Sequence, residues 1–357
     1  MKNYPMVKLG DVCEKGSSSI AQKDIELNEG EYPIYGASGK IKNVDFFKQN
    51  KEYIAVVKDG AGIGRTMLLP AYSSVIGTMQ YILPKENVLT KYLYHAITAM
   101  NLAKYFSGAT IPHIYFKDYK NEKLPLPNKL TQAEIVKLFD KIIDLISKRK
   151  EQLSKLDELA KSRFIEMFGN PVLNDKNWET KKMADVAPVK NYDGVIENKV
   201  WLLNLDMVES QSGEIIDYLY VDKSTLGSSI CSFDESNVLY SKLRPYLNKV
   251  VLPECKGVAT SELLPLRPQK ELDRLFLAHL LRSDSFVDYI SNKVAGAKMP
   301  RVSMGDFRNF DCILPPIELQ ISYKEYIQQL DKSKFRIKKS LEKLEMTYKA
   351  LLQEYFG

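Results

Sequence analysis

One stretch of this sequence occurs twice and decides the fold: residues 107–127 read SGATIPHIYFKDYKNEKLPLP, and residues 295–315 read AGAKMPRVSMGDFRNFDCILP. Six landmark residues coincide when one copy is laid on the other, and each pair is 188 positions apart. The pairs are Gly108/Gly296, Pro112/Pro300, Asp118/Asp306, Asn121/Asn309, Leu126/Leu314 and Pro127/Pro315. A constant separation of this kind indicates a duplicated structural unit.

The repeat extends in both directions from this stretch. Downstream, the separation of 188 continues through Leu153/Leu341 and Gly169/Gly357, whereas upstream it shortens to 184 at Lys58/Lys242 and to 174 at Lys8/Lys182. Loops of different length between matching elements are typical of two divergent copies of one domain. The sequence therefore predicts two related domains, at residues 1–127 and 171–314.

A long helix is predicted after each domain, at residues 128–170 and 315–357, because glycine disappears and apolar residues recur at alternating steps of four and three. Thr131 with Glu134 predicts a capping box at the start of the first helix, and Gly169 predicts its end. The positions predicted to form a helix–helix interface are Ile135, Phe139, Ile142, Ile146, Leu153 and Leu156 in the first helix and Ile327, Leu330, Ile337, Leu341, Leu344 and Leu351 in the second.

These helices need a partner. About 38 residues at 1.5 Å each form a rod of roughly 57 Å, and one face of it is too apolar for water. We therefore expect the two helices to form an antiparallel coiled coil that places the domains at opposite ends; helices that each pack on their own domain are the alternative. Arg149, Arg163 and Lys334 interrupt the apolar positions and indicate either a register signal or a surface for another protein's helices.

The domains themselves consist of short β-runs between turns, for example at residues 53–57, 79–83, 200–204 and 248–252. Helical patches follow these runs in both copies. The predicted fold class is α+β: two α/β domains separated by two long helices that form an antiparallel coiled coil, with an internal pseudo-twofold repeat.

Composition excludes several classes of protein. The 357 residues are 45% hydrophobic and 27% charged, with no apolar run long enough for a bilayer and no signal peptide, so we expect a cytoplasmic globular protein. The four cysteines form no CxxC pair and the three histidines no HExxH motif, so we expect no metal site. A net charge of +6 is compatible with a polyanionic partner without requiring one.

Two glycine-rich segments resemble cofactor loops but lack the required context. Residues 59–64 read DGAGIG after an apolar run, as in loops that hold S-adenosylmethionine or a dinucleotide, yet the strand-like RTMLLP at residues 65–70 stands where a helix is needed. Residues 36–41, GASGKI, lack the first glycine and the hydroxyl residue of a P-loop. We predict turns at both places, no cofactor and no catalytic residue.

Basic, hydroxyl and amide side chains gather beside aromatics and glycines at matching positions of the two copies. Such groups contact guanine, adenine or phosphate, and a carboxylate accepts from cytosine. The candidate DNA-binding residues are Tyr35, Ser38, Lys40, Lys42, Lys58, Arg65, Thr78, Gln80, Thr110 and His113 in the first copy and Lys242, Arg244, Tyr246, Lys249, Ser261, Glu262, Lys298 and Arg301 in the second. Each taken alone is compatible with solvated surface; the matching clusters favour a binding face.

Taken together, these features resemble the specificity subunit of type I restriction-modification enzymes over essentially the whole chain. Trp178 resembles the tryptophan that often opens such a domain, whereas the first copy has none near Tyr4. The segments similar to the landmarks of that family are VKLGDV at 7–12, YPIYG at 32–36, KDGAGIGR at 58–65, LYSKLRPY at 239–246 and TSE at 260–262, with the proline-terminated segment before each helix.

The resemblance implies two target-recognition domains that each read one part of a split DNA site, with the paired helices as spacer. It implies double-stranded DNA, two modification (methyltransferase) subunits and motor/nuclease restriction subunits as partners. S-adenosylmethionine and adenine methylation then belong to the modification subunits, and this chain is non-catalytic. The alternatives are a stand-alone S-adenosylmethionine-dependent DNA methyltransferase, a specificity subunit of a related restriction system outside type I, and a coiled-coil scaffold indifferent to DNA.

Overall fold

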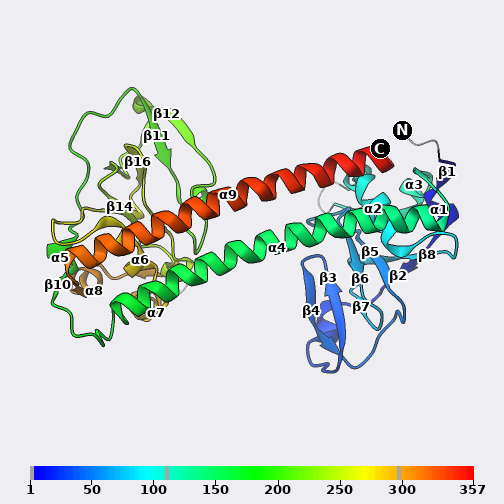
Figure 1. The fold of residues 1–357 in the computed structure, drawn as a ribbon, viewed down its shortest axis with the longest axis horizontal. Helices are drawn as coiled ribbons and strands as arrows, with labels where there is room; N and C mark the ends of the chain where they lie inside the picture. The colour runs from blue at the N-terminus through cyan, green and yellow to red at the C-terminus, as the bar shows by residue number, and fades with distance from the viewer. Residues whose placement is uncertain (1–3, 109–111, 296–298) are drawn as a thin grey trace. The chain divides into compact units, whose positions relative to one another are not determined.

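The computed structural model describes residues 4–108, 112–295 and 299–357, and the chain forms two compact units. Unit 1 comprises Met1–Glu151 and Lys338–Gly357, and unit 2 comprises Gln152–Ile337. Each unit contains an α+β domain and part of each of two long helices, labelled α4 and α9 in Figure 1. None of the helices in the described ranges is long and apolar enough to cross a membrane.

The elements follow the same general order in both halves of the chain. The first half contains β1 (Met6–Lys8), α1 (Leu9–Val12), β2 (Cys13–Ser17), β3 (Tyr32–Gly36), β4 (Gly39–Val44), β5 (Tyr53–Val57), β6 (Thr66–Leu69), β7 (Ser74–Val75), β8 (Met79–Pro84), α2 (Thr90–Ala99), α3 (Phe116–Tyr119), β9 (Lys123–Pro125) and α4 (Lys129–Phe168). The second half contains β10 (Thr180–Lys182), α5 (Met183–Val186), β11 (Lys199–Leu203), β12 (Leu219–Asp222), β13 (Ile230–Phe233), β14 (Val238–Ser241), β15 (Val250–Val251), β16 (Gly257–Thr260), β17 (Leu263–Leu266), α6 (Arg274–Arg282), α7 (Asp284–Ser291), β18 (Val294–Ala295), β19 (Arg301–Val302), α8 (Met304–Arg308), β20 (Asp311–Ile313) and α9 (Ile317–Phe356).

The core of each unit contains a central strand with an antiparallel neighbour on each side, and a helix packs on it. In unit 1, β5 lies between β8 and β6 in the sheet β2-β8-β5-β6, all its residues are buried, and α2 packs on it. In unit 2, β14 lies between β17 and β15, and α6 packs on it. The second sheets differ: β4-β3-β7 in unit 1 and β12-β11-β16-β13 in unit 2. The units therefore share a core and differ in the sheet beside it.

Matching elements recur at the separations predicted from the sequence. The strand β1 and helix α1 recur 174 positions later as β10 and α5, and α2 recurs 184 positions later as α6. The strand β9 and helix α4 recur 188 positions later as β20 and α9, with identical lengths. The antiparallel pairing of β1 with β9 recurs between β10 and β20. The duplicated unit and the α+β fold class are confirmed.

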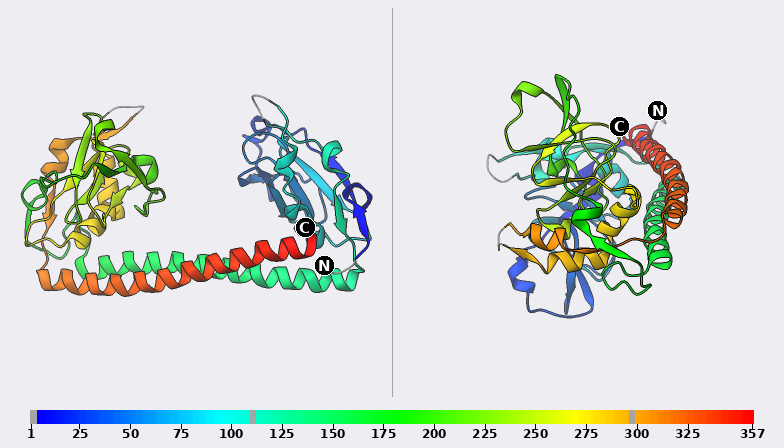
Figure 2. Two further views of the ribbon diagram at one scale, coloured as in Figure 1. Left: turned by 90° about the horizontal axis from the view of Figure 1, so that it is seen from above. Right: turned by 90° about the vertical axis from the view of Figure 1, so that its left-hand side faces the viewer.

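The long helices run antiparallel in unit 1, and their ribbons lie side by side in Figure 2. Phe139 of α4 packs on Phe356 of α9, with ring centroids 6.0 Å apart. Eleven residues further along α4, Lys150 forms a 3.3 Å ion pair with Glu345, which lies eleven residues earlier in α9. Contacts that advance along one helix and recede along the other define an antiparallel pair.

The same relation holds in unit 2. The rings of Phe168 in α4 and Tyr323 in α9 lie 5.3 Å apart. Eleven residues earlier in α4, Asp157 forms a 2.6 Å ion pair with Lys334, eleven residues later in α9. Lys334, which interrupts the apolar pattern of α9, therefore forms an ion pair with Asp157 of α4.

Burial along the helices follows the predicted period. Every residue predicted for the helix–helix interface is buried or half-buried. Between residues 143 and 159, the side chains shielded from solvent are those of Ile146, Arg149, Leu153 and Leu156. Six buried apolar residues of the two helices fall outside the prediction, namely Ala160, Phe164, Phe168, Tyr323, Leu352 and Phe356. They lie toward the helix ends, where each belongs to the core cluster of a domain.

The start of α4 differs from the prediction. The helix begins at Lys129, and the Asn128 side chain accepts a 2.9 Å hydrogen bond from the backbone N–H of Thr131. Asn128 is therefore the cap, and the predicted capping box of Thr131 and Glu134 is wrong. The predicted end is confirmed, because Gly169 follows the last helical residue with φ of +76°.

A buried glutamine near its start joins α4 to the domain of unit 1. The carbonyl oxygen of the Gln132 side chain accepts from the N–H of Leu89 at 2.9 Å. Its amide donates to the carbonyls of Asn87 at 3.2 Å and Pro127 at 2.9 Å. These three bonds satisfy backbone groups of the loop before α2 and of the segment that enters the helix.

Gln320, 188 positions later, makes the same three bonds in unit 2. It accepts from the N–H of Asp273 at 2.8 Å and donates to the carbonyls of Glu271 at 3.1 Å and Pro315 at 2.8 Å. Both glutamines are fully buried. A buried amide with all three partners in place is a strong local constraint, because the loss of any bond leaves a buried polar group unpaired.

We predict that Gln320→Leu lowers the free energy of unfolding by about 3 kcal/mol, because it leaves three buried backbone groups without a partner. Urea denaturation followed by circular dichroism measures this loss. The control is Gln329→Leu on an exposed position of the same helix, expected to change stability by no more than about 0.5 kcal/mol. Equal effects of the two substitutions would show that the three bonds carry no stability.

A buried histidine lies against the long helices in each unit. In unit 2, Nδ1 of His279 lies 2.8 Å from the Tyr323 hydroxyl. Burial, together with the positive charges of Arg282 and Lys334, lowers the pKa of His279 to about 3. In unit 1, His95 stacks on Phe139, and burial lowers its pKa to about 4. Both imidazoles are neutral in the folded protein at neutral pH.

We predict that stability falls as the pH drops below about 6.5, the ordinary histidine pKa, because the unfolded chain then binds protons that the folded chain refuses. The contribution is complete above pH 6.5 and is lost progressively down to the folded pKa values of about 4 and 3. At pH 5 each histidine accounts for roughly 2 kcal/mol. Urea midpoints at pH 7.5 and 5.0 measure the effect, which should be smaller in His279→Gln; an undiminished pH dependence in that variant would contradict the assignment.

Candidate nucleic-acid interface

Three segments of unit 1 meet beside the end of β5 and are joined by backbone hydrogen bonds. The N–H of Lys58 donates to the carbonyl of Thr78 at 3.0 Å, that of Gly60 to Pro112 at 2.9 Å, and that of Ile114 to Lys58 at 2.9 Å. We call residues 58–60, 78 and 112–114 junction 1. Because these bonds use only the main chain, they fix the backbone whatever side chains the positions carry.

The same three hydrogen bonds occur in unit 2. The N–H of Lys242 donates to Glu262 at 3.0 Å, that of Arg244 to Pro300 at 2.8 Å, and that of Val302 to Lys242 at 2.8 Å. Each of these residues is the repeat partner of its counterpart in junction 1. We call residues 242–244, 262 and 300–302 junction 2. The two junctions share one backbone frame and carry different side chains.

Junction 1 carries an acid–base cluster. Oδ1 of Asp59 lies 2.7 Å from Nδ1 of His113, and Oδ2 lies 3.0 Å from the ammonium of Lys58. All three side chains are between a quarter and two-fifths exposed. The cluster connects the segment after β5 with the segment before α3, so two of the predicted residues, Lys58 and His113, lie together.

Junction 2 carries a different acid–base pair at the same place. Nη2 of Arg301 lies 3.0 Å from Oε1 of Glu262, and Nε lies 3.3 Å from both carboxylate oxygens. This hydrogen bonding raises the pKa of Arg301 above its usual value. Lys242 and Arg244 lie on the adjacent segment, so the junction has three cations and one anion. That balance suits a polyanion.

Beside junction 1, Arg65 binds the turn of the β3–β4 hairpin. Its Nη1 donates to the carbonyl of Ala37 at 2.9 Å, and its side chain is otherwise exposed. Ser38 and Lys40 are exposed on that turn, and Tyr35 is half-buried. The ammonium of Lys42 is bound to the carbonyl of Glu26 at 3.0 Å, on the same hairpin sheet.

Two candidates are corrected by the structure. Gln80 is 2% exposed, and its amide donates to the hydroxyl of Tyr119, so it belongs to the core. Lys249 is half-buried, and its ammonium binds the carbonyl of Leu205 at 2.6 Å, so it holds a loop. Both lie on or beside strands, where alternate residues face inward.

The remaining candidates fall into two groups. Thr78 and Ser261 are exposed on turns, and Tyr246 is exposed in the short 3-10 helix Pro245–Leu247 that follows Arg244. Thr110 and Lys298 lie outside the residues that the structure describes.

Arg244 has a strained backbone. Its φ is +50°, a left-handed conformation that costs a non-glycine residue about 1–2 kcal/mol. Its repeat partner Gly60 has φ of +84°, with no atom within 4 Å of the place where a Cβ would lie. A glycine would therefore suit position 244 better for folding alone, and an exposed arginine there points to a function for the side chain. The sequence pattern selected Arg244 but did not reveal this strain.

The segments that resemble cofactor loops are turns, as predicted. After residues 59–64, β6 pairs antiparallel with β5, so no helix N-terminus is available there for a cofactor phosphate. Residues 36–39 form the turn between β3 and β4. Among the described residues, no three or more His, Cys, Asp or Glu side chains are grouped to hold a metal ion.

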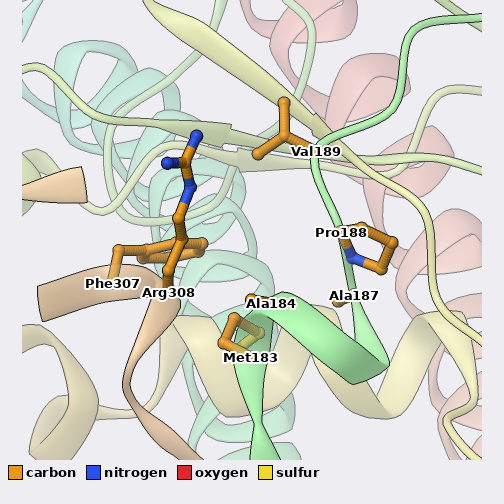
Figure 3. Close-up of a pocket in the computed structure, with 7 residues that line it drawn as sticks. All are labelled: Met183, Ala184, Ala187, Pro188, Val189, Phe307 and Arg308. Carbon is orange, nitrogen blue, oxygen red and sulfur yellow. The ribbon is translucent and has the colours of Figure 1, made fainter. Parts of the chain in front are cut away.

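A shallow hollow of about 180 Å³ lies beside α5 and α8 in unit 2 (Figure 3). It is lined by Met183, Ala184, Ala187, Pro188, Val189, Phe307 and Arg308. Arg308 is the one titratable side chain in this lining, so the hollow holds no acid–base or nucleophilic pair. The junctions remain the richer site for polar contacts.

Comparisons with known proteins agree with this architecture. Residues 1–156 match the family model described as the type I restriction modification DNA specificity domain. The chain is 19% identical to the type I restriction enzyme EcoDI specificity subunit of Escherichia coli, over 92% of this chain and 81% of that protein. It is 24% identical to the MjaVIII specificity subunit of Methanocaldococcus jannaschii, over 96% and 91%.

The fold is also that of a solved structure. The type I restriction-modification system S subunit from M. genitalium superposes with a TM-score of 0.59 at 14% identity, over 99% of this chain and 96% of that one. This chain contains two copies of one α+β domain, each followed by a 40-residue helix. Residues 1–156 therefore match the DNA specificity domain of these systems, and the chain is similar over more than nine-tenths of its length to specificity subunits of type I restriction enzymes.

We predict that Arg244→Gly stabilises the protein by about 1 kcal/mol, because the relief of left-handed strain exceeds the extra freedom that glycine gives the unfolded chain. Thermal unfolding measures the change. Arg244→Ala keeps the strain and is expected to leave the stability unchanged. A lower stability of Arg244→Gly would show that the arginine side chain supports the fold.

Proposed function

We propose that this chain reads a split DNA site on behalf of a type I restriction-modification complex. Residues 1–127 recognise one part of the site, residues 171–314 recognise the other, and the helices within 128–170 and 315–357 set the unread gap. The observation that carries the proposal is the backbone frame common to both junctions. Two readers of one design that carry different side chains suit two different half-sites at a set spacing.

The side chains at the junctions have the chemistry that DNA requires. Arginine and lysine donate to phosphates and to the O6 and N7 atoms of guanine, and hydroxyl groups donate to or accept from either. Junction 1 offers Thr78 with Arg65 nearby, and junction 2 offers Lys242 and Arg244. Tyr246, 49% exposed, adds an aromatic surface beside them.

We further propose that the long helices bind two modification subunits, which supply S-adenosylmethionine and methylate adenine, and that motor/nuclease subunits join for restriction. Exposed apolar side chains outside the helix–helix contact support a protein surface there. They are Ile143 (38% exposed), Leu145 (44%) and Leu159 (45%) on α4 and Met346 (69%) on α9.

We assign no catalytic residue to this chain. Burial raises the pKa of the Cys13 and Cys312 thiols to about 12, so neither supplies a thiolate at neutral pH. A stand-alone S-adenosylmethionine-dependent methyltransferase using residues 59–64 would need a helix after Gly64, where β6 stands. The chemistry is therefore placed on the partner subunits.

We predict that exchanging residues 1–127 for the corresponding domain of another specificity subunit changes one half of the methylated motif and leaves the other half intact. The hybrid and the unmodified chain are each produced with the modification subunits, and methylated adenines are mapped by single-molecule sequencing. The reciprocal exchange of residues 171–314 is the control and should change the opposite half. A motif unchanged in both halves would refute the proposed division of labour.

A further inference from the structure

Each junction has an acid–base pair at the same point of the shared backbone frame. The pair is Asp59 with His113 in junction 1 and Glu262 with Arg301 in junction 2. His113 and Arg301 are repeat partners, and each is bound to a carboxylate. The carboxylates come from different segments: Asp59 follows β5, whereas Glu262 precedes β17. The arrangement is therefore repeated by position and not by residue type. A packing requirement would conserve the residues, whereas readers of two different sequences need the position kept and the chemistry changed.

The contacts at junction 2 leave part of the guanidinium free to bind. Glu262 takes Nε and Nη2 of Arg301, with N–O distances of 3.0 to 3.3 Å, so the planar group is held along one edge. Nη1 is directed away from that edge. An arginine fixed in this way has already lost much of its side-chain freedom, and it presents donors suited to the O6 and N7 acceptors of guanine.

Junction 1 presents a hydrogen-bond acceptor where junction 2 presents donors. When Nδ1 of His113 donates to Asp59, the neutral ring carries its lone pair on Nε2. That atom accepts from an exocyclic amino group, such as N6 of adenine or N4 of cytosine. The repeat partner of Glu262 is Thr78, which is exposed in junction 1. Thr78 has no carboxylate, so it does not form the kind of ion pair that Glu262 forms with Arg301 in junction 2.

We propose that Arg301, positioned by Glu262, reads a guanine in the second half-site, and that His113, positioned by Asp59, reads an amino-bearing base at the equivalent step of the first. This inference rests on the proposed DNA-reading function and deepens it by naming the residues that set specificity. Arg301 and His113 contact the bases, while Glu262 and Asp59 are positioning residues that act through them.

The first experiment tests junction 2 by methylome mapping of the complete complex. In Arg301→Lys, which keeps the charge and loses the planar fork, preference for guanine at one position of the second half-site should fall about ten-fold or more. Glu262→Gln should relax the same position by a smaller factor without changing binding to nonspecific DNA. Glu197→Gln, which breaks the exposed pair with Lys256 in the same unit, is the matched control and should leave the motif unchanged.

The second experiment moves the pair from unit 2 to unit 1. The triple variant Asp59→Leu, Thr78→Glu, His113→Arg gives junction 1 the acid–base pair of junction 2 on a frame that already has the same three hydrogen bonds. We expect one base of the first half-site to change to guanine while the second half-site stays as it was. Thermal unfolding of the variant checks that the fold is retained.

The outcomes separate this inference from the function on which it rests. If the unmodified chain directs no split motif, the proposed function fails. If it does, but the motif is the same in Arg301→Lys, or binding weakens equally for all DNA sequences, then Arg301 contacts phosphate or nothing and the inference fails alone. A folded triple variant whose first half-site is unaltered also overturns it.

Discussion

The structure depends on the attachment of each long helix to the domain that precedes it, and one buried amide makes that attachment. Gln132 and Gln320 each bond the loop before the covering helix and the proline-terminated segment that enters the long helix. Each long helix has 40 residues, so a small change in the direction of its axis at the start displaces its far end by a large distance. Three hydrogen bonds in a dry environment restrict that direction far better than apolar contacts, which tolerate sliding.

Much of this fold could be predicted from sequence because periodicity reports burial directly. The interface positions from Ile135 to Leu351 follow from steps of four and three, and the repeat follows from constant separations. What the pattern missed depends on partners distant in sequence. Asn128 caps the helix through its bond to Thr131, and Phe164 is buried by Phe276 of a domain as well as by Tyr323 of the partner helix. Gln132 looks like an ordinary polar residue until Asn87 and Leu89 are placed beside it.

The candidate site was less predictable, for a physical reason. The sequence identifies side chains whose polar groups could bind DNA. It does not identify which of these groups already form hydrogen bonds within the protein. The sequence predicts Gln80 and Lys249 as binders, yet the side chain of Gln80 is bound to Tyr119 and that of Lys249 to the carbonyl of Leu205. Conversely, nothing in the sequence couples Asp59 to His113 across 54 positions or Glu262 to Arg301 across 39. The strain at Arg244 is visible only as a dihedral angle.

The main-chain construction of the junctions has an evolutionary consequence. Because their hydrogen bonds involve no side chain, substitutions at positions such as 113 or 301 leave the scaffold intact, and a gene can pass through many intermediate alleles that all encode folded protein. The two copies can also diverge separately, since the three hydrogen bonds of each junction join residues of a single unit. On the proposed function of the junctions, a lineage that carries such a gene can acquire a new recognition sequence through a few point mutations, without rebuilding the molecule that presents it.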